Sequence, residues 1–515
     1  MSRNSWWKIL ALCIVFFLWL FTVSPGHDWG GDFSQYILHA INLAEGRPYA
    51  DIGYIRNVFS YVGPAAYPPV FPALLAPVYW VSGLDWLAFK AVVIAAFCAA
   101  LFFATSLQGN KLSAAHQFAI IILLALSPYF WGLKDQVLSD FVFMMICMVM
   151  LALLDRRYLK EDVGFRDAQS SNWLFAIPMG LLLYLGFATR EIGVVFIPVI
   201  VLFELIHFRK VSLVSSAAVV IFLGLAAIQS VSLEIPEADA ELSQRVDELG
   251  IDQGYGETDI DNSNFFNLDP QRVFAKTLRY GSELGVLWPL ADNAFVATAG
   301  WTALLLALGF ALAGYVRGVL AGPGVLEIFV AGYLLVVVLY GGWQGLRYVV
   351  PLVPIFFFYA FVFHGQLLRS QYRKTAIAIA TVFIGATSVS YASNYRAYIS
   401  NHGDGVTSPD AVALFEYIKT STPEASTFVF QKPRVLALLA NRSASGWAGL
   451  KSAERLPDYM DAIGAEYLVY SNIDHRRTSH PVVSVSLPDG AFALEYSNER
   501  FYLYRRIATK AARLP

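Results

Sequence analysis

The chain has 515 residues, of which 57% are hydrophobic and only 15% are charged, with a mean hydropathy of +0.52. Soluble globular proteins carry about one quarter charged residues, so this composition excludes an ordinary soluble protein and predicts an integral membrane protein. The net charge of −2 provides no excess of basic groups, and nucleic acid is therefore not an expected partner. Cys13, Cys98 and Cys147 lie inside apolar runs, which argues against a disulfide framework or a zinc site.

The N-terminal apolar run is predicted to be a retained first span. Arg3 and Lys8 flank its start, and the run 9–23 is rich in Phe and Trp and ends in Ser-Pro-Gly, without the small-residue cleavage site of a signal peptide. A span needs about 20 apolar residues. On that criterion the sequence predicts about eleven spans, at 7–24, 85–107, 115–132, 137–154, 172–189, 192–207, 212–231, 293–315, 325–341, 347–365 and 375–393.

The fifth and sixth predicted spans belong to one long apolar stretch that Arg190-Glu191 interrupts. A charged pair is not left at the centre of a bilayer, so we expect a helical hairpin that turns at the outer face.

The short loops fall into two groups that differ in charge. Basic residues concentrate at 3–8, 156–166, 209–210 and 369–374, and the positive-inside rule makes these segments cytoplasmic. The loops 25–84 and 232–292, together with everything after 394, then lie on the periplasmic or extracellular side. An odd number of spans is needed for this arrangement, and eleven satisfies it.

Local patterns predict elements in both large outer loops. In the first, apolar residues at helical spacing favour a helix from Asp32 or Phe33 that ends at Gly46, and the proline-broken run 67–79 suits an interfacial or re-entrant segment. In the second, the run 272–280 is a basic amphipathic helix of the membrane-surface type.

The tail is predicted to be a small soluble α/β domain. Ser408-Pro-Asp reads as an N-cap followed by a proline at the first helical position, which opens a helix to about 420. Short strands are expected at 427–430, 467–470 and 501–504, with helical segments such as 455–463 between them. The predicted domains are therefore a transmembrane domain, 1–393, and a soluble domain, 394–515.

Asp32 is the strongest candidate for chemistry. It lies just beyond the first span, after Gly30-Gly31 and before a helix, at the mouth of a multi-span bundle. The alternative is that Asp32 only caps the helix that follows. Asp28, four residues earlier, is a second candidate carboxylate with an equally open structural alternative.

Four segments around these candidates, and the tail, resemble a known superfamily. They are Gly31-Asp-Phe-Ser-Gln-Tyr36 with the later Tyr67-Pro-Pro-Val-Phe-Pro72, Lys134-Asp-Gln-Val-Leu-Ser-Asp140, Leu185-Gly-Phe-Ala-Thr-Arg190, Gly345-Leu-Arg-Tyr348, and, in the tail, Lys432-Pro and Ala465-Glu-Tyr-Leu-Val-Tyr470. Together they resemble the GT-C membrane glycosyltransferases, which include protein O-mannosyltransferases and bacterial aminoarabinose–lipid A transferases. Many of these enzymes carry Asp-Glu in the first outer loop, whereas Phe33 replaces the Glu here.

The resemblance implies a glycosyltransferase of a bacterial inner membrane. Its donor would be a polyprenyl-phosphate-linked sugar, its acceptor a glycolipid, glycan or protein at the outer face, and its surroundings the membrane lipids. An inverting transfer needs a carboxylate base for the acceptor proton and cations for the departing lipid phosphate. Asp32 matches the base.

Four cations and a tyrosine are candidates for binding the donor. Lys134, Arg190 and Arg347 fall at the predicted outer ends of spans, Tyr348 follows Arg347 in the matched motif, and Arg56 is a further candidate. Each could instead be an interfacial anchor. No metal is chemically required, although Asp28, Asp32, Asp135 and Asp140 could gather around a divalent ion.

Two other functions share the membrane class. A transporter or flippase for lipid-linked saccharides would show internal repeats and ionisable groups near mid-membrane. No repeat is evident, and the ionisable groups cluster at one predicted face. A polysaccharide polymerase would ordinarily lack the early Asp loop and the long tail.

Overall fold

The computed structural model describes residues 6–57, 64–109, 111–158, 173–233, 269–288, 293–340, 345–400, 405–446, 453–471, 487–488 and 490–507. Contacts divide the chain into two compact units. The helical unit comprises Met1–Val23, Leu87–Gln229 and Asp259–His402, and the mixed unit comprises Ser24–Trp86, Ser230–Thr258 and Gly403–Pro515. The predicted loop 25–84 therefore belongs to the same compact unit as the tail.

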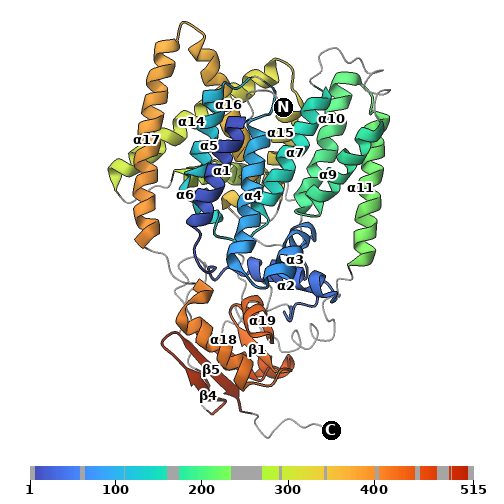
Figure 1. The fold of residues 1–515 in the computed structure, drawn as a ribbon, viewed down its shortest axis with the longest axis vertical. Coiled ribbons are helices and arrows are strands. Elements are labelled where there is room, and N and C mark those ends of the chain that lie inside the picture. The colour runs from blue at the N-terminus through green and yellow to red at the C-terminus, as the bar shows by residue number, and fades with distance from the viewer. Residues whose placement is uncertain are drawn as a thin grey trace. The chain divides into compact units, whose positions relative to one another are not determined.

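The helical unit is built almost entirely from helices (Figure 1). They are α1 (Trp6–Phe21), α4 (Trp86–Ala104), α5 (Ala114–Ala125), α6 (Pro128–Leu133), α7 (Asp140–Tyr158), α9 (Ala176–Phe187), α10 (Phe196–Phe208), α11 (Leu213–Ser232), α13 (Pro270–Glu283), α14 (Ala294–Leu320), α15 (Val325–Leu339), α16 (Val353–Leu368) and α17 (Arg373–Ser400). Short 3-10 segments are η1 (Trp173–Phe175), η2 (Glu191–Val195), η3 (Leu284–Leu287) and η4 (Gly345–Leu352).

Among the described residues, six helical stretches are long and apolar enough to cross a membrane, and the chain is a multi-pass membrane protein. They are Trp86–Ala104, Glu191–Phe208, Leu213–Ser232, Ala294–Leu320, Gly345–Leu368 and Arg373–Tyr395. Helices lie in all eleven predicted ranges, but several are shorter than a full span, so the count of eleven stays a prediction.

Burial separates inner from outer helices of this unit. In the most apolar 18-residue stretch of Gly345–Leu368, 67% is buried inside the protein. The corresponding share is only 22% in α11 and in α17. Figure 1 accordingly shows α11 and α17 at opposite edges of the helical unit. Their exposed leucines, isoleucines and valines are the surface that lipid chains would cover, since in a bilayer apolar side chains need no protein cover.

The predicted break at Arg190 is present as a tight turn. Helix α9 ends at Phe187, Arg190 is extended with φ −150°, and η2 begins at Glu191. The turn is tight because two glycines meet: a Cβ on Gly193 would lie 2.4 Å from the carbonyl carbon of Gly186. The charged pair therefore sits where two apolar helical segments reverse direction.

The mixed unit contains a five-stranded sheet of order β2-β1-β3-β5-β4. Strand β1 (Thr427–Phe430) pairs in parallel with β2 (Ser443–Ser445) and β3 (Tyr467–Ser471), while β5 (Phe501–Arg506) is antiparallel to both β3 and β4 (Phe492–Ser497). The tail also contains the helices α18 (Pro409–Ser421), α19 (Pro433–Ala440) and α20 (Leu456–Ala462). A short 3-10 turn, η6 (Ala453–Arg455), leads directly into α20. Another such turn, η5 (Gly405–Thr407), precedes α18.

The loop 25–84 contributes two helices and an extra edge to this sheet. Tyr54 forms a parallel bridge with Ala444, the Ile55 amide donates to the Ala444 carbonyl at 2.9 Å, and the Ala444 amide donates to the Gly53 carbonyl at 2.8 Å. Helix α2 (Asp32–Glu45) packs against α3 (Val70–Ser82) and α19. The backbone of the loop thus satisfies the outer edge of β2, which would otherwise be an unpaired strand edge.

Candidate functional site

Asp32 is the first residue of α2, and it does not cap that helix. The N-cap position belongs to Gly31, and the helix has no side-chain capping hydrogen bond there. The helix ends after Glu45, with Gly46 in the left-handed conformation at φ +68°, as the sequence predicts. The capping alternative for Asp32 therefore loses its geometric basis.

The Asp32 carboxylate is held by a tyrosine and an arginine. Its Oδ1 accepts hydrogen bonds from the Tyr67 hydroxyl at 2.9 Å and from Arg434 Nη2 at 3.2 Å. The Asp32 side chain keeps 27% of its surface exposed, while that of Arg434 keeps only 4%. The acid is thus reachable and its cation is enclosed, so the pair presents an oriented carboxylate to the surroundings.

Arg434 is tied to the same elements on its other side. Its Nη1 donates to Gln35 Oε1 at 2.7 Å and to the Tyr67 hydroxyl at 3.2 Å. Burial alone would lower the pKa of Arg434, but the neighbouring Tyr67 and Asp32 outweigh it and raise that pKa. The guanidinium is therefore a permanent charge beside Asp32.

A neutral histidine lies behind this network. His39 Nδ1 is 2.8 Å from the Tyr49 carbonyl, and its Nε2 is 3.2 Å from the Tyr67 amide. A carbonyl can only accept and an amide only donate, so Nδ1 carries the proton and Nε2 is the acceptor. Burial lowers the pKa of His39 to about 4; the bond to Tyr49 opposes that shift and the Arg434 charge adds to it. At neutral pH the imidazole is therefore uncharged, and both of its nitrogens are engaged in hydrogen bonds to the backbone.

Asp28 is engaged locally. Its Oδ1 accepts from the Gly30 amide at 2.9 Å and lies 3.1 Å from His27 Nδ1. The His27 ring stacks on fully buried Phe33 at a centroid distance of 3.7 Å. Phe33, which replaces the Glu of the resembling motif, is therefore a core residue, and the contacts of Asp28 are those of a turn. Its catalytic role stays a prediction.

The helical unit contains a second carboxylate–guanidinium cluster. Asp140 opens α7, Arg190 lies in the turn before η2, and Arg347 lies in η4. Arg190 Nη2 is 2.9 Å from Asp140 Oδ1, and Arg347 Nη2 is 3.2 Å from Asp140 Oδ2. The exposed fraction of the side chain is 2% for Asp140, 13% for Arg190 and 24% for Arg347. Two cations thus share one enclosed anion, and the carboxylate of Glu283 also acts on the nearby Tyr129.

Tyr129, on α6, adds a polar atom near this cluster that the sequence does not flag. Its hydroxyl is buried and has no hydrogen-bond partner among the described residues. The charges that act on it include those of Asp140, Arg347 and Arg190. A buried hydroxyl without a partner is costly, so an ordered water or a bound group would be needed to complete its hydrogen bonding.

The remaining predicted binding residues are distributed differently. Lys134 is fully buried: its Nζ donates to the Thr22 carbonyl at 2.7 Å and to Asp135 Oδ2 at 2.8 Å, which are the contacts of a structural ion pair. Arg56 is half-buried in the segment that follows the Tyr54 bridge. Tyr348 is half-buried, and its carbonyl accepts from the Tyr333 hydroxyl.

Arg190 and Arg347 lie together in the structure, because both pair with Asp140. Asp32 belongs to the other compact unit, so its convergence with the two arginines stays a prediction. Across the described ranges, no three side chains of His, Cys, Asp or Glu are gathered as at a metal site, so Asp28, Asp32, Asp135 and Asp140 do not form a ready-made ligand set there.

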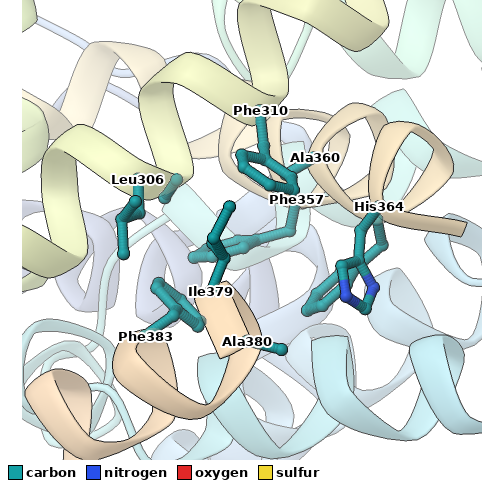
Figure 2. A pocket seen from close by; sticks show the side chains of 10 residues that line it. Leu306, Phe310, Phe357, Ala360, His364, Ile379, Ala380 and Phe383 are labelled. Atoms are coloured by element: carbon teal, nitrogen blue, oxygen red, sulfur yellow. The ribbon is translucent and has the colours of Figure 1, made fainter. Parts of the chain in front are cut away.

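An apolar pocket in the helical unit is separate from these polar clusters. Figure 2 shows side chains of α14, α16 and α17 around it, including Leu306, Phe310, Phe357 and Phe383. His364 is its polar member, and the ring nitrogens of His364 lie 3.0 Å from His116 Nε2 and 3.2 Å from the Ala376 carbonyl. The pocket offers no acid–base pair for transfer chemistry.

Comparison with known proteins agrees with this architecture. No family model and no curated protein matches the sequence. Among solved structures, the archaeal oligosaccharyltransferase of Archaeoglobus fulgidus, tethered to an acceptor peptide, aligns with a TM-score of 0.59 at 12% identity over 91% of this chain and 69% of its own. ArnT from Cupriavidus metallidurans, bound to undecaprenyl phosphate, aligns with a TM-score of 0.57 at 13% identity over 99% of this chain and 100% of its own.

Both of these structures are GT-C membrane glycosyltransferases. The predicted resemblance is therefore confirmed at the level of the fold, which this chain shares with both structures.

Proposed function

We propose that the protein is an inverting glycosyltransferase that uses a polyprenyl-phosphate-linked sugar as donor and Asp32 as general base. The observation that carries the proposal is the partly exposed Asp32 carboxylate at the start of α2, which accepts hydrogen bonds from Tyr67 and the enclosed Arg434. The fold supports the same class, and the neighbouring ArnT structure holds undecaprenyl phosphate.

In the proposed step, an acceptor hydroxyl or amine attacks the anomeric carbon of the sugar. Its proton passes to the Asp32 carboxylate as the new bond from the anomeric carbon to the acceptor forms. The bond between that carbon and the phosphate oxygen breaks, and the lipid phosphate leaves with the electron pair. The transition state resembles an oxocarbenium ion, as in glycoside hydrolysis.

The cluster around Asp140 is proposed to hold the donor phosphate. Asp140 orients the two guanidinium groups from behind, and the more exposed edges of Arg190 and Arg347 can then meet an anion. The buried Tyr129 hydroxyl, which lacks a partner among the described residues, is a suitable third donor to the same phosphate. Positive charge already in place stabilises the leaving group without reorganisation. Lys134 is not assigned to this role because its ammonium is bonded to Thr22 and Asp135.

The proposed location is the outer face of a bacterial inner membrane. The concentration of basic residues in one set of loops supports a cytoplasmic N-terminus and an outer tail, by the positive-inside rule. Reporter fusions after Arg166, which lies outside the described residues, and after Thr407 should report opposite sides. The same side for both would contradict this orientation.

The proposal is tested by sugar transfer with purified protein in detergent and a panel of undecaprenyl-phosphate hexoses and pentoses. Candidate acceptors are identified by mass spectrometry. The membrane glycolipids, envelope glycans and glycoproteins of a deletion strain are compared with those of its parent. Release of undecaprenyl phosphate that requires acceptor and Asp32 supports a transferase. Movement of the intact lipid-linked sugar across reconstituted vesicles without cleavage would instead indicate a flippase.

A further inference from the structure

The two partners of the ion pair at the candidate base come from opposite ends of the chain. Asp32 opens α2, and Arg434 lies 402 positions later, in the first turn of α19. Pro433 occupies the first helical position of α19, where its missing N–H costs nothing. The tail, which looks like an appendage in sequence, therefore supplies the cation nearest the candidate base in the mixed unit.

Arg434 binds its partners through two separate guanidinium nitrogens, so its contacts depend on direction as well as on charge. Nη2 donates to Asp32, while Nη1 donates to Gln35 and to Tyr67, which itself donates to Asp32. A planar guanidinium fixes the direction of each bond, and a lysine ammonium could not span the three partners. The network consequently sets the angle at which the carboxylate is presented, as well as its charge.

The residue before Asp32 leaves room for this approach. A Cβ on Gly31 would lie 2.5 Å from Arg434 Nη2. The backbone of Gly31, with φ −91° and ψ −20°, is one that alanine adopts without strain. Glycine is required here by the guanidinium and not by the turn.

We propose that Arg434 is a positioning residue for the candidate base: it keeps the Asp32 carboxylate ionised and aimed, so that the tail is part of the catalytic machinery. The inference rests on the proposed function of Asp32. An adjacent cation favours the charged form of a carboxylate, and its removal lets the acid take up a proton at higher pH.

The test is the pH dependence of sugar transfer by the full-length protein with undecaprenyl-phosphate sugar. Arg434→Met keeps the length of the side chain but not its charge or fork. We expect the pH below which activity is lost to rise by about 1–3 units, the usual effect of one neighbouring cation on an aspartate. Arg434→Lys should restore part of the charge effect but not the full rate.

Arg442→Met is the matched control. Arg442 is also buried in the tail, but it donates to the carbonyls of Lys419, Thr422 and Asn441 and, within the described part of the chain, to no carboxylate. Its loss should lower the melting temperature without moving the acidic limb of the profile. An Arg434→Met protein with the wild-type acidic limb would overturn the proposal.

Two further variants keep the question open to refutation if Arg434→Met folds poorly. Gly31→Ala retains Arg434 but obstructs its approach, and it should move the acidic limb in the same direction. Double-variant analysis by melting temperature needs no substrate: the losses from Asp32→Asn and Arg434→Met should be less than additive. Additive losses refute the pairing, whereas coupled losses in a protein that transfers no sugar refute only the proposed function.

Discussion

The two carboxylate–guanidinium clusters have opposite patterns of exposure. In the mixed unit the acid, Asp32, is partly exposed and its cation, Arg434, is enclosed. In the helical unit the acid, Asp140, is enclosed, and its cations, Arg190 and Arg347, are only partly buried. The same chemical pair can thus present either a proton acceptor or a binding site for an anion, depending on which partner is buried.

This contrast assigns roles that residue type alone does not. An exposed carboxylate fixed by a buried cation is suited to take a proton from an attacking group. Exposed guanidinium groups fixed by a buried carboxylate are suited to hold a phosphate. Replacing the exposed member should change chemistry or binding, whereas replacing the enclosed member should first disturb the geometry.

The largest effect is expected from Asp32→Asn. The amide retains the shape of the side chain but accepts no proton, and loss of a general base commonly costs on the order of 10²–10⁴-fold in rate. The measurement is the rate of sugar transfer at a temperature at which the variant and the wild-type protein are both folded. Asp28→Asn is the control, because Asp28 bonds to the Gly30 amide within its own turn. An inactive Asp28→Asn protein together with a fully active Asp32→Asn protein would assign the general base to Asp28 instead of Asp32.

Arg347→Met should weaken binding of undecaprenyl phosphate on the order of 10²-fold, since hydrogen bonds between charged groups are among the stronger ones. Binding is measured by the rise in melting temperature with added lipid. Arg317→Met is the control: Arg317 lies on α14 and donates to Gln366 Oε1 at 2.7 Å, outside the cluster. Equal weakening in both variants would show a general effect of charge and not a site.

His39 should make the wild-type protein less stable in mild acid. The pKa of His39 is lowered to about 4 by burial, so between pH 6.5 and 4 the unfolded chain binds a proton that the folded chain refuses. Stability from this residue is therefore complete above pH 6.5 and falls with pH, by about 2 kcal/mol at pH 5. His39→Gln should flatten the fall in melting temperature across that window; an unchanged slope would assign the loss to other groups.

The smallest effect is expected from Tyr129→Phe, which should change lipid binding without lowering the stability of the protein. Tyr129→Phe should weaken binding of undecaprenyl phosphate by about 10-fold, yet leave the melting temperature of the lipid-free protein equal or higher, because it removes a buried hydroxyl without a partner. Tyr391→Phe is the matched control, since the Tyr391 hydroxyl donates to the Leu123 carbonyl at 3.3 Å. It should lower stability and leave binding unchanged. A drop in melting temperature for Tyr129→Phe would contradict the assignment.

The helices were predictable because a bilayer forces apolar segments to satisfy their own backbone. The break at Arg190 and the end of α2 at Gly46 followed from a charged pair and a stop signal. Strands β1, β3 and β5 were predictable from apolar residues in short runs, but β2 and β4 were not. Ser443–Ser445 has little apolar content, and Phe492–Ser497 is a mostly exposed edge strand, so neither carries the usual pattern.

The candidate site was predictable in part. Asp32, Arg190 and Arg347 stand out because charged residues flank apolar runs, but their partners do not. Nothing local relates Arg434 to Asp32 across 402 positions, and Asp140 reads equally well as a metal ligand. Lys134 has the same sequence context as the two arginines, yet packing encloses it, and burial of a single side chain is a tertiary property.

The attachment of the loop to the sheet has a consequence for biosynthesis. Gly53 and Ile55 leave the ribosome long before Ala444, their hydrogen-bonding partner on β2, and Asp32 likewise precedes Arg434 by 402 positions. At the usual 5–20 residues per second, the early segment waits roughly 20–80 s for its partners. During that interval the carboxylate has no guanidinium beside it. The protein therefore acquires the Asp32–Arg434 ion pair only when the last part of the chain has been translated, and a product truncated before Arg434 would carry Asp32 without this cation.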